Sequence, residues 1–273
     1  MKASGAIDIA TAVISLIAES VSRLTSEAVA GILAGQAGFS RRQVRAAIRS
    51  LVDSGELSYS YELGCSFLEQ SFNRPLKVSG RVVLAPPDKS FEPIGPEVLV
   101  RLAPGAAFGY GRHPTTRLAL KAIETALGKW PDFLVDREAR VLDIGTGSGV
   151  LVIAAVLMGL GQGTGIDIDP CSIAEAKKNI THNGLSHKIV ISDAPFETQH
   201  GRFSMITANL RYPTLSRISA GVAKRTGRQG VFIMSGIKTD ELDQLTKIYT
   251  SLGFKDEQKW NEKGWAAVLM RRH

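Results

Sequence analysis

The chain has 273 residues, with 33 Lys and Arg against 26 Asp and Glu and a formal net charge of +7. Its 44% hydrophobic and 22% charged residues are typical of a globular protein with a sizeable core. The longest apolar run, residues 149–160, is too short to span a bilayer, and two cysteines are too few for a disulfide framework or a zinc site. We therefore expect a cytoplasmic protein of one or two domains, with no signal peptide.

The excess of positive charge lies outside the first 75 residues. Residues 1–75 hold seven basic and seven acidic residues, so their net charge is zero. An anionic partner such as a nucleic acid would therefore have to contact the rest of the chain as well.

The first 75 residues have the pattern of three helices and a hairpin. Apolar residues recur at helical spacing in residues 7–21, 26–35 and 40–55, and residues 55–71 then alternate. Ser26 and Ser40 are predicted to cap the second and third helices. The third helix places an apolar face beside an arc of arginines, with members Val44, Ile48, Leu51, Val52 and Arg41, Arg42, Arg45, Arg49. Residues 1–75 thus resemble a winged-helix domain.

The rest of the chain changes to alternating strands and helices. Residues 76–106 predict a connecting β segment. Residues 107–273 predict seven strands, with helical patterns between the first five, at 139–145, 163–169, 188–193, 203–209, 230–236, 254–260 and 265–270. This order indicates an α/β, Rossmann-like domain whose seven-stranded sheet is mostly parallel. The last two strands lack an intervening helix and are expected to form an antiparallel pair at one edge.

A glycine-rich turn at residues 145–149 carries the strongest chemical signal. A buried strand ends at Asp143 and turns through Gly145, Gly147 and Gly149 into a helix, while the next strand ends at Asp167. Glycines allow a ligand to approach the backbone closely. A carboxylate at the end of the second strand suits a ribose diol, since it accepts hydrogen bonds from both hydroxyls.

The details of this turn select the cofactor. The spacing is G-x-G-x-G with an acid just before it, whereas dinucleotide sites use G-x-G-x-x-G, and no triphosphate loop is present. Asp143 would repel a pyrophosphate but attract the ammonium and sulfonium groups of S-adenosylmethionine (AdoMet). We therefore predict AdoMet as the cofactor, and no metal.

Three further segments complete the expected site. Asp193 follows the third strand, where it can accept from the adenine amino group, and Asn209 ends the fourth strand, where its carbonyl can hold a neutral amine. Residues 104–116, "PGAAFGYGRHPTT", are expected to close over the methionine end of AdoMet. Within them His113 is expected to have a structural or substrate-orienting role, or to remove a proton.

Several of these motifs resemble one known family. "AFGYGRHPTT", "VLDIGTGSGVLVIAA", "GIDIDP", "ANLRYP" and "SGI" look like the PrmA-type methyltransferases, which methylate amino groups of a large-subunit ribosomal protein. The resemblance implies an AdoMet-dependent class I fold with Thr116, Gly145, Asp167 and Asn209 at cofactor-contacting positions. The fourth strand departs from the family pattern and also resembles the N-x-x-Tyr motif of amino-directed methyltransferases, which makes Tyr212 available to pack on a flat acceptor. The winged-helix-like segment replaces the family's usual recognition domain, which argues for a changed substrate.

The expected site has three groups of residues. The catalytic residues are Asn209, Tyr212 and His113. The acceptor-selecting residues are Tyr110, Arg112, Arg211 and Tyr212. The cofactor-binding residues are Phe108, Gly109, Gly111, Thr116, Asp143, Gly145, Gly147, Gly149, Asp167, Ile168, Asp193 and Asn209. Trp130, Trp260 and Trp265 are expected to pack in the core or the sheet.

Three functions fit these residues. The first is methyl transfer from AdoMet to an amine of a small molecule or a protein. The second is cyclisation or cleavage of AdoMet with release of methylthioadenosine, because cofactor contacts do not dictate which carbon reacts. The third is binding or methylation of nucleic acid through the arginine face of the third helix. Because its charge is balanced, we expect the N-terminal domain to act as a lid or a homodimer interface.

Overall fold

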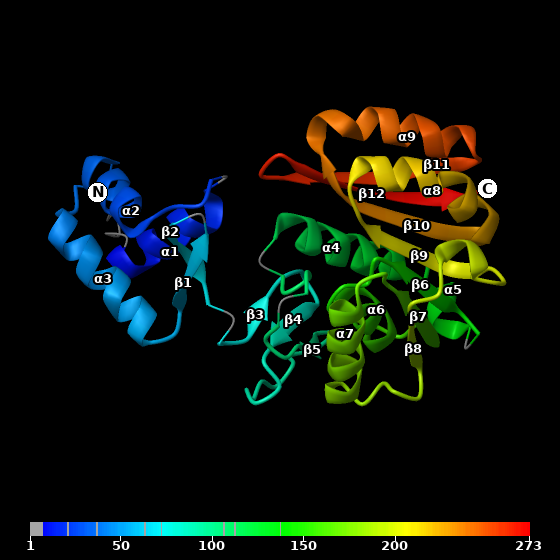
Figure 1. The fold of residues 1–273 in the computed structure, drawn as a ribbon, viewed down its shortest axis with the longest axis horizontal. Coiled ribbons are helices and arrows are strands. Elements are labelled where there is room, and N and C mark those ends of the chain that lie inside the picture. The colour runs from blue at the N-terminus through cyan, green and yellow to red at the C-terminus, as the bar shows by residue number, and fades with distance from the viewer. Residues whose placement is uncertain are drawn as a thin grey trace, which may run out of the picture. The chain divides into compact units, whose positions relative to one another are not determined.

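The computed structural model describes residues 8–273 except 21, 37, 63, 72, 106, 112 and 137. The chain divides into two compact units, Met1–Arg74 and Pro75–His273 (Figure 1). In the described part of the chain, no helix is both long enough and apolar enough to cross a membrane.

The first unit consists of three helices and a hairpin. Its elements are α1 (Ile9–Glu19), α2 (Ser26–Gln36), α3 (Arg41–Asp53), β1 (Leu57–Glu62) and β2 (Cys65–Gln70). The strands pair antiparallel, and Leu24 adds an isolated bridge to Leu68. Ser40 caps α3 as predicted, in a capping box with Gln43. The prediction for Ser26 was wrong: the hydroxyl of Thr25 accepts from the N–H of Ala28, so α2 is capped one residue earlier.

Helix α3 separates its apolar and basic residues as predicted. Val44, Ile48 and Leu51 are buried in the core of the first unit, and the four arginines are exposed. Two of them are paired: Arg41 and Arg45 both reach Glu27 on α2, at 3.5 and 2.7 Å. This one carboxylate contacts two of the four arginines inside the unit and balances one of their four charges.

The second unit contains the predicted seven-stranded sheet. Its strands run in the order β11-β12-β10-β9-β6-β7-β8, and β6 to β10 are parallel while β11 and β12 are antiparallel at one edge. The strands are β6 (Arg140–Ile144), β7 (Gln162–Ile166), β8 (Ile189–Ser192), β9 (Phe203–Asn209), β10 (Thr226–Lys238), β11 (Phe254–Glu262) and β12 (Trp265–Arg272). The expected fold class of this unit is thereby confirmed.

Helices cover both faces of the sheet, as the alternation of strands and helices requires (Figure 1). Helices α8 (Tyr212–Arg225) and α9 (Leu242–Ser251) pack on one face around the buried ring of Tyr249. The other face holds α4 (Pro114–Lys129), α6 (Val150–Leu157) and α7 (Pro170–His182), with the short α5 (Asp132–Val135) between α4 and β6. Helix α6 is apolar on every side and is almost wholly buried.

One connection differs from the predicted pattern. Between β8 and β9 the chain forms only the 3₁₀ turn η1 (Phe196–Thr198), where a helix was expected. Pro195 and Gly201 bracket this short connection, which leaves too little chain for a helix of several turns. A second 3₁₀ turn, η2 (Thr239–Glu241), leads from β10 into α9.

Residues 76–101 form a small sheet within the second unit. Strands β3 (Leu76–Lys77), β4 (Val82–Ala85) and β5 (Val98–Arg101) lie in that order, with β3–β4 antiparallel and β4–β5 parallel. Two asparagines of α7 hold the end of β5: Asn183 bonds both backbone groups of Arg101, and Asn179 accepts from Ala103. This segment, expected as a connection, is thus attached to the larger unit.

The strand order fixes where a ligand crevice forms. The chain runs outward from β6 to β8 and then returns to the other side of β6 as β9. In doubly wound sheets ligands bind at such a switch, beyond the carboxyl ends of the strands. Here that position lies at the ends of β6, β7 and β9.

Candidate functional site

The glycine turn after β6 is tied to the end of β7. The N–H of Gly147 donates to one carboxylate oxygen of Asp167 at 2.9 Å, and the other oxygen accepts from Asp169 at 3.1 Å. Gly147 has φ +53°, and a Cβ there would lie 2.7 Å from the carbonyl oxygen of Phe108. That carbonyl accepts from the N–H of Ser148 at 3.0 Å. Only glycine therefore lets the loop at Phe108 approach this turn so closely.

Asp143 lies beneath the turn and is buried. Its two oxygens accept hydrogen bonds from the hydroxyls of Thr146, at 2.7 Å, and Thr207, at 2.6 Å. Burial raises the pKa of Asp143 to about 6, against the lowering effect of the two hydroxyls. The carboxylate thus belongs to the frame of the turn and keeps a negative charge below it at neutral pH.

The loop before α4 is held by one carboxylate and one guanidinium, from Glu175 and Arg117. Glu175 on α7 accepts from the N–H of Ala107 at 3.0 Å and from the hydroxyl of Tyr110 at 2.8 Å. Arg117 on α4 donates to the carbonyl of Gly111 at 3.0 Å and pairs with Glu262 at the end of β11. The phenol of Tyr110, expected to select the acceptor, is therefore directed toward α7. Burial and Glu175 both raise its pKa.

His113 forms the N-terminal cap of α4. Its Nδ1 accepts from the N–H of Thr115 at 3.3 Å, and its ring lies edge-on to Phe108 and Trp265, with centroids 5.2 and 4.8 Å away. A neutral ring whose Nδ1 accepts carries its proton on Nε2. This tautomer supports an orienting role for His113 over proton removal.

Thr116, in the first turn of α4, has a buried hydroxyl. Among the described residues neither this hydroxyl nor that of Ser148 in the glycine turn has a hydrogen-bond partner. Buried polar atoms without a partner are uncommon in folded proteins, and each calls for an explanation. A bound ligand that accepts or donates here would provide one.

Other expected cofactor residues are exposed at the rim of the switch point. The side chain of Ile168, next to Asp167, is 93% exposed, and that of Phe108 is 52% exposed. Asp193 is exposed directly after β8, as its position in the sequence predicts. Gly145, Gly149, Gly109 and Gly111 all have positive φ, so the two glycine clusters are both turns.

Asn209 ends β9 beside a bulge in β10. The bulge lies at Gly236, where the pairing of β10 with β12 shifts register and φ is +83°. A Cβ on Gly236 would lie 2.6 Å from the carbonyl oxygen of Leu210 and 2.9 Å from the side-chain oxygen of Asn209. The N–H of Leu210 donates to the carbonyl of Ser235 at 3.0 Å, which keeps the two segments together.

The two residues after Leu210 point to different surroundings. Tyr212 begins α8 and packs against the core formed with α9, which favours a structural part for its ring over contact with an acceptor. Arg211 is exposed, and its guanidinium carbon lies 5.0 Å from the ring centroid of Trp265. Arg112, another expected acceptor residue, lies outside the described residues.

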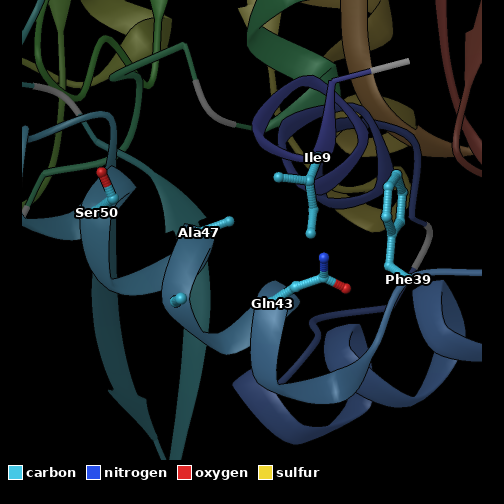
Figure 2. Close-up of a pocket in the computed structure, with 6 residues that line it drawn as sticks. Ile9, Phe39, Gln43, Ala47 and Ser50 are labelled. Atoms are coloured by element: carbon cyan, nitrogen blue, oxygen red, sulfur yellow. The ribbon is translucent and has the colours of Figure 1, made fainter. Parts of the chain in front are cut away.

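A hollow in the first unit is lined by no acidic or basic side chain among the described residues. It lies between α1 and α3, and Figure 2 shows Ile9 and Phe39 facing Gln43 across it. Its other lining residues are Ala46, Ala47 and Ser50, so none of its side chains titrates near neutral pH. Nor does the described part of the chain hold a group of three or more His, Cys, Asp or Glu side chains placed to bind a metal.

Comparison with known proteins identifies the family of this chain. The family model described as "Ribosomal protein L11 methyltransferase (PrmA)" matches residues 68–273. The chain belongs to this family. A ribosomal protein L11 methyltransferase of Geobacter sulfurreducens is 40% identical over 197 residues, covering 72% of this chain and 62% of the relative. One of Desulfotalea psychrophila is 33% identical over 200 residues, covering 72% and 64%.

A solved structure agrees with the fold. The ribosomal protein L11 methylase of Lactobacillus delbrueckii subsp. bulgaricus superposes with a TM-score of 0.64 at 27% identity, covering 73% of this chain and all of that one. This chain spans less than two thirds of the length of the curated PrmA relatives quoted above. The family match leaves α1, α2, α3 and β1 outside it.

Some residues around the PrmA-type site escaped sequence reasoning. Trp265 was expected to serve packing, yet its ring contacts His113 and lies near Arg211. Glu175 and Arg117 hold the loop before α4 from positions far along the chain, and no local motif marks them. The position of Trp265 could have been predicted from the sequence. It begins the last strand directly after a glycine turn, so it lies opposite the end of β10.

Proposed function

We propose that this protein transfers the methyl group of AdoMet to an amine nitrogen of a protein acceptor. One observation carries the proposal: Asp143, Asp167 and Asn209 end the neighbouring strands β6, β7 and β9, with the glycine turn between the two carboxylates. Membership of the PrmA family supports the same activity and the same cofactor.

The residues at the switch point fit AdoMet. Each carboxylate oxygen of Asp167 accepts one hydrogen bond from the backbone, so each keeps a lone pair that can accept from a ribose hydroxyl. The apolar side chains of Ile168 and Phe108 are exposed to solvent, so they can pack against the flat face of an adenine. The partnerless hydroxyl of Thr116 is a further group for the methionine end.

When bound, AdoMet supplies a methyl carbon made electrophilic by its sulfonium. Asp143 contributes a buried negative charge that favours a cation above the turn. The side-chain carbonyl of Asn209 can accept from an amine N–H and so hold the nitrogen lone pair in one direction. Catalysis of this kind rests on position, because an uncharged amine needs no strong base.

The acceptor is inferred from the relatives. The curated relatives are named for ribosomal protein L11, which supports an amine on a protein over one on a small molecule. We further propose that residues 1–75, most of which precede the family match, form a winged-helix-like domain that acts as a lid or a homodimer interface, since its charge is balanced. A nucleic-acid acceptor is less favoured, because Glu27 already pairs two of the four arginines on α3.

One experiment tests the proposed activity. Purified protein is incubated with AdoMet alone, with recombinant ribosomal protein L11, and with total cell extract, and the sulfur products are identified by mass spectrometry. Methyl transfer predicts S-adenosylhomocysteine in the acceptor arms only, with a gain of about 14 Da per methyl on a protein (the mass of a CH₂ group). Methylthioadenosine formed without acceptor would replace the proposal by AdoMet cleavage or cyclisation.

A further inference from the structure

Two cations lie over one tryptophan at the end of the sheet. The ammonium of Lys238 is 3.7 Å from the ring centroid of Trp265, and the guanidinium carbon of Arg211 is 5.0 Å from it. Lys238 and Trp265 are cross-strand partners of β10 and β12, so the strand register brings these two side chains together. We call Arg211, Lys238 and Trp265 the Trp265 cluster.

The charges of the Trp265 cluster are not balanced. Glu241 contacts both residues but only one of the two cations: its Oε1 is 3.7 Å from the Arg211 guanidinium, and its Oε2 accepts from the backbone N–H of Lys238 at 2.7 Å. Within the described part of the chain the Lys238 ammonium has no carboxylate at ion-pair distance. Two cations and one carboxylate leave a net positive charge over an aromatic ring. An aromatic face stabilises cations there but does not neutralise them.

The Trp265 cluster adjoins the proposed acceptor position. Arg211 follows Asn209 by two residues, and Lys238 follows Gly236, whose missing side chain leaves room for the Asn209 carbonyl. The ring of Trp265 also lies edge-on to His113. The cations therefore stand next to the group that would hold the amine, on the side away from Asp167 and the glycine turn.

We propose that the Trp265 cluster binds a carboxylate carried by the acceptor close to its reactive amine. The inference rests on the proposed function and adds a substrate class: amines with an acidic group nearby. Arg211 offers a planar fork that matches a carboxylate, and Lys238 offers a point charge whose position the strand pairing holds. The carboxylate has two sources, an acidic residue beside a lysine in a protein or the carboxylate of a free amino acid.

Binding to the protein loaded with S-adenosylhomocysteine tests the inference. The probes are the peptide Ac-Gly-Ala-Lys-Asp-Gly-NH₂, its Asn twin, 5-aminopentanoate and pentylamine, each titrated by calorimetry. The wild type is expected to bind the Asp peptide about tenfold more tightly than the Asn twin, the scale of one charge-assisted hydrogen bond. A preference for 5-aminopentanoate over pentylamine without a peptide preference would assign the carboxylate to a free amino acid.

Three variants attribute the preference to the Trp265 cluster. In Lys238→Gln and Arg211→Gln the ratio of Asp to Asn peptide affinities is expected to fall toward one. Lys224→Gln removes an exposed charge from the opposite end of α8 and should keep the wild-type ratio. Methylation kinetics with AdoMet should show the same pattern in KM, with kcat little changed.

The results that overturn this inference differ from those that overturn the proposed function. Equal affinity of the wild type for both members of each pair, no measurable binding of any carboxylate probe, or a ratio unchanged in Lys238→Gln rejects the role of the cluster. Failure to bind S-adenosylhomocysteine, or to release it from AdoMet with any acceptor, rejects the methyltransferase proposal.

Discussion

The backbone N–H of Gly147 donates to the carboxylate of Asp167 at 2.9 Å, which joins the glycine turn of one strand to the acidic end of the next. A carboxylate held in this way has a fixed orientation before any ligand arrives. Preorganisation lowers the entropy lost on binding, so the same group that shapes the turn is also well placed to accept from a ribose.

Replacement of Asp167 should therefore weaken AdoMet binding. In Asp167→Ala the turn loses its tie and the ribose loses a charged acceptor, for which we expect a loss of about 1.5 to 3 kcal/mol, or roughly 10- to 150-fold in Kd. Calorimetry with AdoMet measures it. An affinity within twofold of the wild type would refute the assignment of Asp167 to the cofactor.

Asp169 provides a matched control two residues away. Its carboxylate accepts from the hydroxyl of Ser172 at 2.8 Å and caps α7 by accepting from the N–H groups of Cys171 and Ser172, both at 3.1 Å; the hydroxyl first, and then the two N–H groups, lower its pKa. Asp169→Ala should lower the stability by about 1 kcal/mol, as the loss of a helix cap does, with AdoMet affinity little changed. A thermal melt and the same titration distinguish the two carboxylates.

Asp143 should make stability and cofactor affinity respond to pH in opposite directions. Its pKa is raised from 3.8 to about 6 in the folded protein, chiefly by burial. The folded state therefore holds this proton more tightly than the unfolded state does. The stability it contributes is fully present below about pH 4 and is lost as the pH rises through about 6, a change on the order of 3 kcal/mol. A cationic ligand favours the ionised form, so AdoMet affinity should fall as the pH drops below about 6.

The variant Asp143→Asn tests both halves of this expectation. An amide of nearly the same shape can still bond the hydroxyls of Thr146 and Thr207, but it does not ionise. The free energy of unfolding of Asp143→Asn should increase relative to that of the wild type as the pH rises from 4 to 7. Its AdoMet affinity should be weaker and independent of pH over the same range. Urea unfolding and calorimetry at four pH values suffice; parallel pH profiles of the two proteins would contradict the raised pKa.

Tyr110 should act through the loop that carries it. Its hydroxyl donates to Glu175, which also accepts from the backbone of Ala107, so the phenol helps to fix residues 107–111 against α7. In Tyr110→Phe we expect AdoMet to bind several-fold more weakly, on the order of 1 kcal/mol for one hydrogen bond, while the acceptor KM stays close to the wild-type value. A raised acceptor KM at unchanged AdoMet affinity would instead support the acceptor-selecting role first expected from the sequence.

The seven strands and their order of appearance could be predicted because most of them are short apolar runs bounded by glycine, proline or a charged residue. Strand β11 is the exception, since it is mostly polar and buries only Phe254 and Trp260. The glycine turn could also be predicted, since Gly145, Gly147 and Gly149 directly follow a buried strand. What escaped prediction depends on contacts between distant segments. Glu175 on α7 bonds this loop directly, and Glu262 on β11 pairs with Arg117, which donates to the loop at Gly111; only the assembled fold brings these residues together.

The surroundings of individual side chains could not be predicted from the sequence either. Tyr212 and Trp265 are both aromatic residues at element ends, yet the first packs into the core while the second faces His113 and two cations. The difference arises from the turn of α8 and the register of β12, which no local pattern reports. Similarly, Thr25 caps α2 in place of Ser26, because the helix begins one residue earlier than the capping pattern suggested.

The bulge at Gly236 should be required for acceptor positioning rather than for cofactor binding. At φ +83°, a methyl group there would lie 2.6 Å from the carbonyl oxygen of Leu210 and 2.9 Å from the side-chain oxygen of Asn209. In Gly236→Ala the Asn209 carbonyl must move, and a shift of about 1 Å in a positioning group can cost on the order of 100-fold in rate. We expect kcat/KM to fall on that scale while AdoMet affinity changes by less than about threefold, since Asp167 and the glycine turn lie on other strands.

Gly253→Ala is the control, because Gly253 has a similar φ of +89° with no atom within 4 Å of the added Cβ. It carries the same backbone strain without the contact, so equal losses of activity in both variants would show that strain alone, and not the position of Asn209, explains the effect.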